Sequence, residues 1–466
     1  MYPTLATDLQ QLEQILLQTT HEALSILNGL DERPVASVAE RPERRGLDDA
    51  GKGFAATLEE FNQRYAGSFS ASAGPRYLGF VTGGATPAAL AGDWLVSTYD
   101  QNPTSSLDTS APELERETVA CLRELFGLSA AHQGAFVSGA TMSNLVGLAI
   151  GREWIGEQRG VRVAEQGLAA LGPVRILSGA PHSSIYKVAS VLGLGRSAIE
   201  TLPLLPGREA VDLAALEARL AELSGEACIV VGNAGTVNTV DFDDLAALAA
   251  LRERYPFWLH VDAAFGAFAA LSPRHQAMLA GLDLADSICI DAHKWLNVPY
   301  DSAVQFSRRR DLQLRIFMNA AAYLGDPGDN PEFVHLTPEN SRRLRALPSW
   351  FALRAYGRAG IASITMQCCE HAETLGGWIA AAPEFELLAP IRMNVVCYTL
   401  RDLPTGPAGE TAIQDYLQRV RESGETFVTP TVYKGRWAIR ATFSNWRTRA
   451  DDVARAWQAL RAAAGI

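Results

Sequence analysis

The sequence predicts an α/β protein built around one mostly parallel sheet with helices on both faces. Short, β-branched apolar runs recur through the middle of the chain without alternating with polar residues, which is typical of strands buried on both faces. Stretches with helical patterning, such as 212–223 and 243–255, lie between these runs. The chain has 466 residues, 48% of them hydrophobic, so it can bury a large core and form more than one domain.

Six runs are expected to form the strands of this sheet: 135–138, 174–177, 228–231, 258–261, 287–290 and 303–306. Leucines at near-helical spacing predict an amphipathic helix within 5–30, and a second helix is expected over 53–65. From about residue 350 a long helical stretch, 350–381, precedes two further strands, 395–400 and 437–443. The expected division is an N-terminal helical segment, a large domain and a smaller C-terminal α+β domain, covering 1–74, 75–350 and 351–466.

The bulk composition argues against several classes of partner. A net charge of −11 disfavours a nucleic acid or an anionic membrane surface. The six cysteines form no CxxC pair, so no metal site is expected, and their pattern suits a reducing compartment. Asp8 and Glu13 interrupt the apolar N-terminus, which lacks a signal-peptide pattern, and no run of about 18 apolar residues occurs. We therefore expect a cytoplasmic protein with neither nucleic-acid nor membrane partners.

A lysine follows one of the expected strands in the run Asp-Ala-His-Lys-Trp at 291–295. Lys294 leaves the carboxyl end of strand 287–290, and this is the edge at which α/β sheets bind ligands. Burial there is expected to lower the pKa of the Lys294 amine and free it to attack a carbonyl carbon. Such a lysine, taken alone, is more often a surface residue, so its neighbours decide the assignment.

Three more groups of polar residues follow other expected strands. Asp262 can hold a heteroaromatic nitrogen in its protonated form, or it can cap the next helix. His182 can stack on a planar ring, although a lone histidine is more often structural. The turn 138–144, Ser-Gly-Ala-Thr-Met-Ser-Asn, opens a helix whose backbone N–H groups can bind a phosphate, or which is merely N-capped. Together with Lys294, these groups indicate a site for pyridoxal phosphate (PLP).

In order and spacing, the four clusters resemble the group II decarboxylases, which are PLP-dependent enzymes of fold type I. The run Asp-Ala-His-Lys-Trp-Leu-Asn-Val-Pro-Tyr-Asp at 291–301 is especially similar to bacterial members. The separation of 32 residues between Asp262 and Lys294 is also similar. The motifs cover roughly residues 70–360. The resemblance implies a seven-stranded, mostly parallel sheet, a homodimer with its active site at the interface, and PLP-dependent decarboxylation of an L-amino acid.

The resemblance also assigns roles to individual residues. It implies that Lys294 carries PLP as a Schiff base, that Asp262 pairs with the pyridine nitrogen, and that His182 stacks on the ring and serves the reacting carbon. Further contacts to PLP are implied for Ala140, Thr141, Ser143, Thr236, Ala264 and His293. Phe80 and Thr82 match a segment on the substrate side.

Two features of this chain depart from the family's pattern. Asp291 stands where many relatives have asparagine, so its charge near a phosphate requires hydrogen bonds. The segment 325–341 is rich in Gly and Pro and has no periodicity, which favours a lid loop. Alignment backward from Arg342 puts Phe333 where many aromatic decarboxylases have a proton-donating lid tyrosine. Phe333 has no proton to give, so His335 or a loop of a partner subunit would have to replace that donor.

The missing lid donor leaves the product open. Decarboxylation to an amine and carbon dioxide is the first expectation, and oxidation to an aldehyde, as in relatives with such a Phe, is the second. A catalytically silent PLP-binding protein is a remote third reading. Arg440 is a candidate for binding a carboxylate. An aromatic or otherwise bulky substrate side chain is favoured by aromatic residues that could equally be core, namely Tyr77, Phe80, Trp94 and Tyr99.

Overall fold

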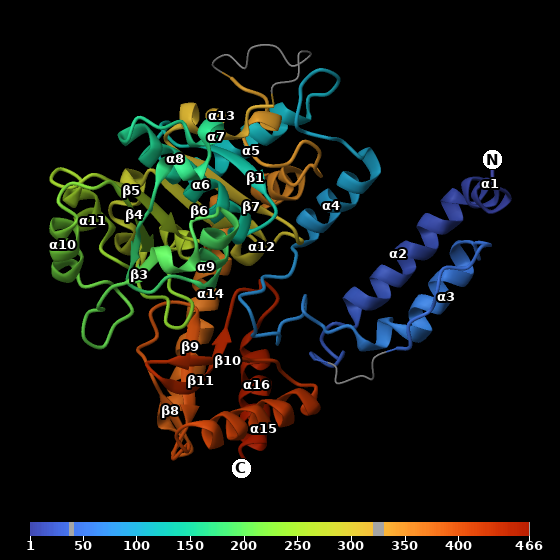
Figure 1. The fold of residues 1–466 in the computed structure, drawn as a ribbon. Coiled ribbons are helices and arrows are strands. Elements are labelled where there is room, and N and C mark those ends of the chain that lie inside the picture. Colours follow the sequence, from blue (N-terminus) through green and yellow to red (C-terminus); the bar gives the residue numbers. More distant parts are fainter. Residues whose placement is uncertain (37–41, 320–329, 466) are drawn as a thin grey trace.

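The computed structural model describes residues 1–36, 42–319 and 330–465. A seven-stranded sheet forms the centre of the large domain, in the order β1-β7-β6-β5-β4-β2-β3 (Figure 1). Only β7 runs against its two neighbours. The predicted mostly parallel sheet is confirmed. Its strands are β1 (Gln133–Val137), β2 (Ile176–Ser178), β3 (Ile199–Thr201), β4 (Cys228–Asn233), β5 (Phe257–Asp262), β6 (Ser287–Asp291) and β7 (Ala303–Ser307).

All six predicted strands are present, and the sequence pattern did not indicate β3 because Ile199 is the one buried residue of that edge strand, so no apolar run marks it. The strands read as continuous apolar runs because both of their faces are covered. In β4, Cys228 and Val230 pack into the core on one face, whereas Ile229 and Val231 pack into the core on the other. Helix α6 (Ala140–Gln158) covers the second face.

The remaining helices are distributed over both faces and both domains. They are α4 (Pro87–Tyr99), α5 (Ala111–Leu125), α7 (Val163–Gln166), α8 (Leu168–Leu171), α9 (Ser183–Val191), α10 (Leu213–Glu222), α11 (Leu245–Leu251), α12 (Ala292–Trp295), α13 (Arg310–Phe317), α14 (Ala346–Ala381), α15 (Pro407–Ser423) and α16 (Ala450–Ala463). Within the described ranges, none of the helices is both long and apolar enough to cross a bilayer.

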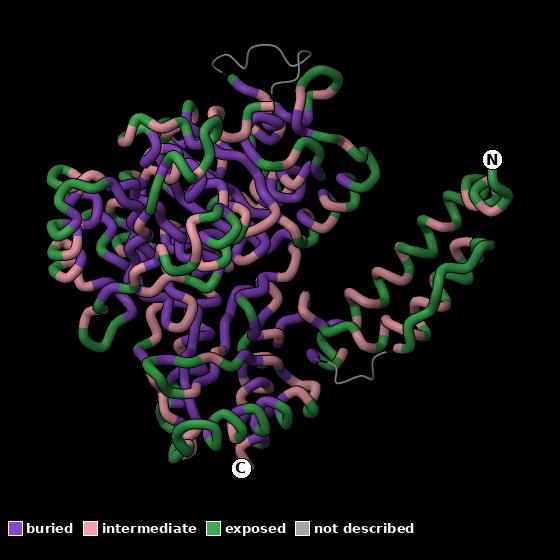
Figure 2. Tube along the Cα trace, viewed as in Figure 1, coloured by how far each residue is buried: buried purple, intermediate pink, exposed green. Residues whose placement is uncertain are grey.

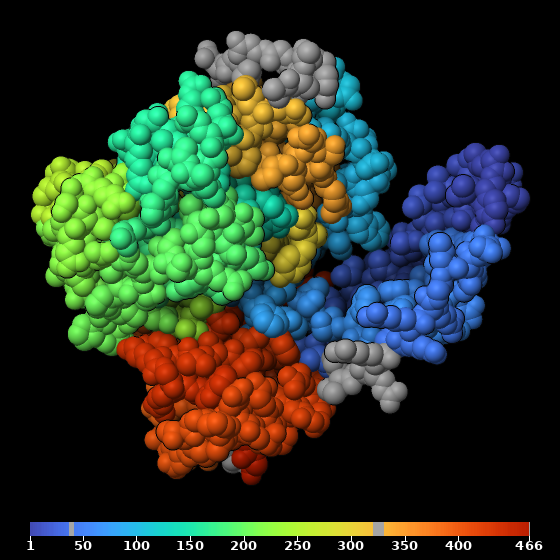
Figure 3. Space-filling view, in the orientation of Figure 1, coloured from blue at the N-terminus to red at the C-terminus, as the bar shows by residue number. Residues whose placement is uncertain are grey.

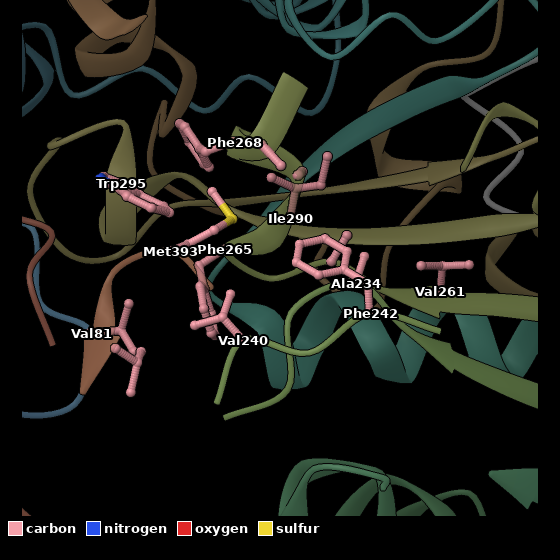
Figure 4. Packing of buried hydrophobic residues seen from close by; sticks show 14 of the residues in the cluster. Val81, Ala234, Val240, Phe242, Val261, Phe265, Phe268, Ile290, Trp295 and Met393 are labelled. Carbon is pink, nitrogen blue, oxygen red and sulfur yellow. The ribbon is translucent and has the colours of Figure 1, made fainter. Parts of the chain in front are cut away.

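The small domain is joined to the large one by α14 and by a shared core. Its antiparallel sheet has the order β10-β11-β9-β8, and the predicted boundary at 350/351 falls inside α14. Figure 4 shows Phe265, Phe268 and Trp295 of the large domain packed with Met393 of the small domain. The strands of the small sheet are β8 (Phe385–Leu387), β9 (Val395–Leu400), β10 (Thr429–Tyr433) and β11 (Arg436–Thr442).

The N-terminal segment forms an arm that stands apart from the large domain, as Figures 1 and 3 show. The single helix predicted within 5–30 is two helices, α1 (Pro3–Gln10) and α2 (Leu12–Asn28), which meet at Gln11, and α3 (Phe54–Arg64) follows. None of these three helices contains a buried residue (Figure 2). Leucines at helical spacing are therefore exposed: Leu5, Leu9, Leu12, Leu16, Leu17 and Leu24.

A buried ion pair connects the segment that precedes α14 to helix α5. Arg342 donates two hydrogen bonds to Glu115, at 2.7 and 2.8 Å, and both side chains are fully buried. Replacing Arg342 with alanine would leave the Glu115 carboxylate buried without its partner, so we expect unfolding to become easier by about 3–5 kcal/mol. Urea denaturation measures this change. Arg354→Ala, at the exposed pair with Glu117, is the control and should cost far less stability because solvent screens exposed ion pairs; equal losses in the two variants would contradict the prediction.

Candidate active site

A cavity of about 710 Å³ opens at the carboxyl ends of the parallel strands. This is the edge at which open α/β sheets bind ligands, and the volume suits a cofactor together with a substrate. Phe80 lines the cavity, and the other predicted residues that line it follow five different strands: Ala140 and Thr141 after β1, His182 after β2, Thr236 after β4, Asp262 and Ala264 at the end of β5, and His293 and Lys294 after β6. Thr431, Arg440 and Thr442 of the small domain complete the wall.

Lys294 is held as an ion pair with a neighbouring carboxylate. Its Nζ lies 2.9 Å from Asp291 Oδ2 and 5.6 Å from the centre of the Phe265 ring. Burial acts to lower the pKa of Lys294, but the charges of Asp291 and Asp262 outweigh it, and the pKa is raised. The sequence-based expectation of a lowered pKa is therefore wrong for this state, because that expectation considered desolvation without the carboxylates. Asp291 thus stabilises the ammonium form of Lys294.

Asp262 presents its carboxylate to the same cavity as Lys294. The backbone N–H of Ala264 donates to Oδ1 at 3.2 Å, and the side-chain amide of Asn144 donates to Oδ2 at 3.0 Å. A carboxylate can accept more than one hydrogen bond on each oxygen, so both oxygens keep acceptor capacity. Asp262 can therefore receive an N–H from a ring nitrogen without giving up either protein contact.

His182 caps helix α9 with its ring. Its Nδ1 accepts the backbone N–H of Ser184 at 3.2 Å and lies 2.8 Å from the Ser184 hydroxyl. A backbone N–H can only donate, so Nδ1 is an acceptor and the neutral ring carries its proton on Nε2. Desolvation of the ring among the cavity residues lowers the pKa of His182, although the residue keeps an exposed face, and the imidazole is therefore neutral near pH 7.

The amino end of α6 can receive a phosphate. The helix has 19 residues, and its first backbone N–H groups have no partner within the helix. No side chain caps its N-terminus, so these N–H groups remain available to a ligand. Ala140 and Thr141 bring these groups to the cavity wall. His293 lies beside them; its Nδ1 accepts the N–H of Ser302 at 3.2 Å, and its Nε2 is 3.6 Å from Asp291 Oδ2. The helix dipole and the free N–H groups favour an anion here.

These groups fit PLP in kind and in number. The cavity offers an amine for the aldehyde, a carboxylate for the pyridine nitrogen, an imidazole for the ring and an uncapped helix end for the phosphate. Asp291 Oδ1 is buried without a hydrogen-bond partner among the described residues, which leaves a polar atom for a ligand or water to satisfy. Lys294, Asp262, His182 and the start of α6 would thus hold PLP.

Thr236 is oriented by a buried glutamate that sequence reasoning missed. The Thr236 hydroxyl donates to Glu209 Oε2 at 2.6 Å and accepts the backbone N–H of Asp241 at 2.9 Å. Glu209 also accepts hydrogen bonds from Thr239 and Asn238, at 2.8 and 3.0 Å. Glu209 sits in a polar stretch that resembles an ordinary turn, so no local signal marks it.

Four predicted residues do not line this cavity. Ser143 faces the sheet, because it lies two residues after Thr141 and is therefore turned by about 200° around the helix, and its hydroxyl donates to Val304 O at 3.2 Å. Thr82 is buried with its hydroxyl 3.3 Å from that of Tyr300. Phe333 and His335 lie in a short 3₁₀ turn and are both buried.

The Phe333 ring packs in a small cluster with Ala135 and Leu336, below the guanidinium groups of Arg116 and Arg342. His335 Nδ1 accepts the N–H of Asn319 at 3.0 Å. Gly325, Pro327 and Gly328 of the predicted lid lie outside the described residues. A contact of Phe333 or His335 with substrate therefore stays a prediction, and it would require a second subunit or a rearranged loop.

Comparisons with known proteins agree with this geometry. A family model described as "Pyridoxal-dependent decarboxylase conserved domain" matches residues 49–401. An aromatic-L-amino-acid decarboxylase of Bacillus atrophaeus is 26% identical over 484 residues, covering 100% of this chain and 98% of that protein. An L-2,4-diaminobutyrate decarboxylase of Rhizobium meliloti (strain 1021) is 28% identical over 430 residues, covering 89% of this chain and 83% of that protein.

A solved structure described as Oryza sativa TDC with PLP and tryptamine has a TM-score of 0.90 at 21% sequence identity, covering 98% of each chain. This likeness confirms the predicted fold. The match of the family model extends over most of the chain and confirms the resemblance inferred from the four clusters. The chain therefore belongs to the pyridoxal-dependent decarboxylase family, and it is a PLP-dependent carboxy-lyase that acts on an amino acid.

Proposed function

We propose that the protein decarboxylates an L-amino acid with an aromatic or otherwise bulky side chain, giving the amine and carbon dioxide. The observation that carries the reaction is the single cavity shared by Lys294, Asp262 and His182. Bound PLP supplies an electron sink for the bond between Cα and the carboxylate. The four residues Ser143, Thr82, Phe333 and His335 have no part in this arrangement within one subunit.

Each residue of the cavity would have a different role in the reaction. Lys294 Nζ would hold the cofactor and would be displaced by the substrate amine, and Asp291 would stabilise the ammonium form of that lysine. The Asp262 carboxylate keeps a ring nitrogen protonated by lying opposite it as an acceptor. His182 offers its Nε2 proton to the substrate side of the site. Arg440 is a candidate partner for the substrate carboxylate, because its Nε has no hydrogen-bond partner among the described residues while Nη1 donates to Val237 O at 2.8 Å.

The cavity wall supports the preference for an aromatic side chain. Phe80 and Phe265 both line it, and Phe80 is 62% exposed, so its ring is available to a ligand. Glu209, the acidic group beside Thr236, already accepts three side-chain hydrogen bonds and is therefore less available to a cationic substrate side chain. Tyr77 stacks on Phe427 instead, and Trp94 and Tyr99 do not line the cavity.

A substrate panel tests this proposal. The PLP-loaded enzyme is incubated with phenylalanine, tyrosine, tryptophan, 2,4-diaminobutyrate and glutamate, and carbon dioxide and amine are quantified. We expect kcat/KM for an aromatic substrate to exceed that for the others by at least about tenfold, the value of one well-packed apolar contact. Phe80→Ala should reduce this preference, whereas Phe69→Ala, at an exposed residue that does not line the cavity, should not. A preference for diaminobutyrate or glutamate would contradict the aromatic assignment.

Oxidative formation of an aldehyde is the second candidate, and Phe333 favours it. The residue aligned with the lid donor has no ionisable proton and is buried away from the cavity in this chain. Without a rapid donor, the carbanionic product of decarboxylation would survive long enough to meet oxygen. Hydrogen peroxide released in equal amount with carbon dioxide would support this candidate, and its absence in air-saturated buffer would exclude it.

We also infer a cytoplasmic homodimer in which the N-terminal arm covers a second copy of the chain. The arm exposes Leu9 and Leu16 on helices without buried residues, and apolar surface of this kind is normally covered. The double variant Leu9→Glu, Leu16→Glu should run as a monomer in light-scattering chromatography at micromolar concentration, where the unaltered protein runs as a dimer. Leu284→Glu, at an exposed leucine of the large domain, is the control. A monomeric unaltered protein would refute the inference.

A further inference from the structure

A continuous chain of buried side chains runs behind Asp262. The Trp258 indole N–H donates to the Ser287 hydroxyl at 3.0 Å, and that hydroxyl lies 2.8 Å from His260 Nδ1. His260 Nε2 lies 2.9 Å from Asn144 Oδ1. These four residues come from β5, β6 and α6, and each is at most 1% exposed.

Asn144 joins this chain to two groups of the active site. Its Nδ2 donates one hydrogen to Asp262 Oδ2 at 3.0 Å and the other to the Ser184 hydroxyl at 3.2 Å. Ser184 in turn lies 2.8 Å from His182 Nδ1. The amide of Asn144 therefore has both hydrogens and its oxygen engaged, and it is fully buried.

The Asp262 carboxylate at one end of the chain can only accept, and the Trp258 indole N–H at the other end can only donate. These two groups together determine the direction of every hydrogen bond between them. An ionised carboxylate only accepts, so the Asn144 amide must turn Nδ2 toward Asp262 and Oδ1 toward His260. His260 must then carry its proton on Nε2, and its Nδ1 must accept from Ser287. Ser287 can do this because the indole N–H, which only donates, fills its acceptor position. Burial lowers the pKa of His260 to about 4, so the ring is neutral and has one N–H to place.

We propose that Asn144 is a positioning residue that orients Asp262 and His182 together, and that Trp258, Ser287 and His260 hold its amide in the required direction. The proposal rests on the roles proposed above for Asp262 and His182. In this proposal one amide positions both residues. The Asn144 amide donates to the Asp262 carboxylate, and it also donates to the Ser184 hydroxyl, which is thereby directed toward His182 Nδ1. His182 is then held as the Nε2–H tautomer and acts as a donor in the cavity.

The first test measures the tautomers directly. In ¹⁵N-histidine spectra of the holoenzyme at pH 7, His260 and His182 should both appear as neutral rings protonated on Nε2. Signals are assigned from their absence in His260→Leu and His182→Gln. A His260 ring protonated on Nδ1, or on both nitrogens, would overturn the proposed direction of the chain.

The second test measures the affinity of the apoenzyme for PLP by quenching of tryptophan fluorescence. Asn144→Asp would set a second carboxylate against Asp262, and we expect the Kd for PLP to rise by about 10- to 100-fold, the scale of a lost hydrogen bond to a charged group. Asn394→Asp, at another fully buried asparagine that donates to a backbone carbonyl, is the control for placing a carboxylate in the interior. Equal effects of the two variants on the Kd would refute a specific role of Asn144.

A conservative rescue separates positioning from packing at His260. His260→Leu removes the donor to Asn144 and should weaken PLP binding, whereas His260→Gln can present a side-chain N–H in its place and should recover most of the affinity. If both variants bind PLP equally well, the direction of the Asn144 amide does not depend on His260, and this step of the proposal fails. No substrate is present in any of these experiments. Their outcomes are therefore independent of which amino acid the enzyme decarboxylates.

Discussion

Replacing Lys294 with alanine is expected to reduce decarboxylation by at least about 10³-fold, within the range seen when an essential acid–base group is removed. The lysine is the amine of the cavity that can bond covalently to the aldehyde of PLP, and its Nζ lies 2.9 Å from the Asp291 carboxylate, which stabilises its ammonium form. The absorbance of covalently held PLP should disappear in the same variant. Turnover with the amino acid that the substrate panel selects measures the first effect, and a spectrum of the purified protein measures the second.

Lys187→Ala provides the control for this experiment. Lys187 lies on α9, is exposed and does not line the cavity, so its loss should leave both the spectrum and turnover intact. A Lys294→Ala variant that keeps covalently bound PLP and full turnover would contradict the assignment of Lys294 as the residue that bonds to PLP. Loss of turnover with the spectrum retained would instead assign Lys294 a role in proton transfer alone.

The sequence was informative about the site because a parallel sheet gathers strand ends that lie far apart in the chain. Lys294, Asp262 and His182 each follow a short apolar run, and placing those runs side by side is enough to bring the three residues to one edge. The pattern of apolar runs could therefore predict which edge of the sheet holds the site, although it contains no information about the distances between side chains. The edge strand β3, in contrast, buries only Ile199, so it contains no apolar run that a pattern could show.

Other parts of the site depend on contacts that no local pattern encodes. The raised pKa of Lys294 follows from the distance to Asp291, three residues before it, and a helical turn at that point was needed to bring the two together. Glu209 reaches Thr236 from a segment 27 residues earlier. Ser143 was assigned to the cofactor because it belongs to the phosphate turn, but its position on α6 points it into the sheet. Orientation within an element, and not the identity of the element, was the missing information.

Replacing Asp262 with asparagine is expected to lower kcat by about 10²- to 10³-fold, the size typical of losing one preorganised electrostatic contact. The change removes the charge that keeps a ring nitrogen protonated. It also introduces a conflict of donors: Oδ1 accepts from Ala264 N and Oδ2 from Asn144 Nδ2, so an amide NH₂ at residue 262 must face one of these N–H groups. Steady-state kinetics with the selected substrate measure the loss.

Asp286→Asn is the matched control, because Asp286 precedes β6 at the opposite end of the sheet and also accepts a backbone N–H, from Leu259, together with an arginine. It should cost stability without changing kcat by more than about twofold, since surroundings outside the cavity do not touch the reacting atoms. If Asp262→Asn lowers stability as Asp286→Asn does but leaves kcat unchanged, Asp262 is a structural carboxylate. A fall in kcat with KM nearly unchanged would mean instead that its charge acts mainly in the transition state, which is where an electron sink is needed.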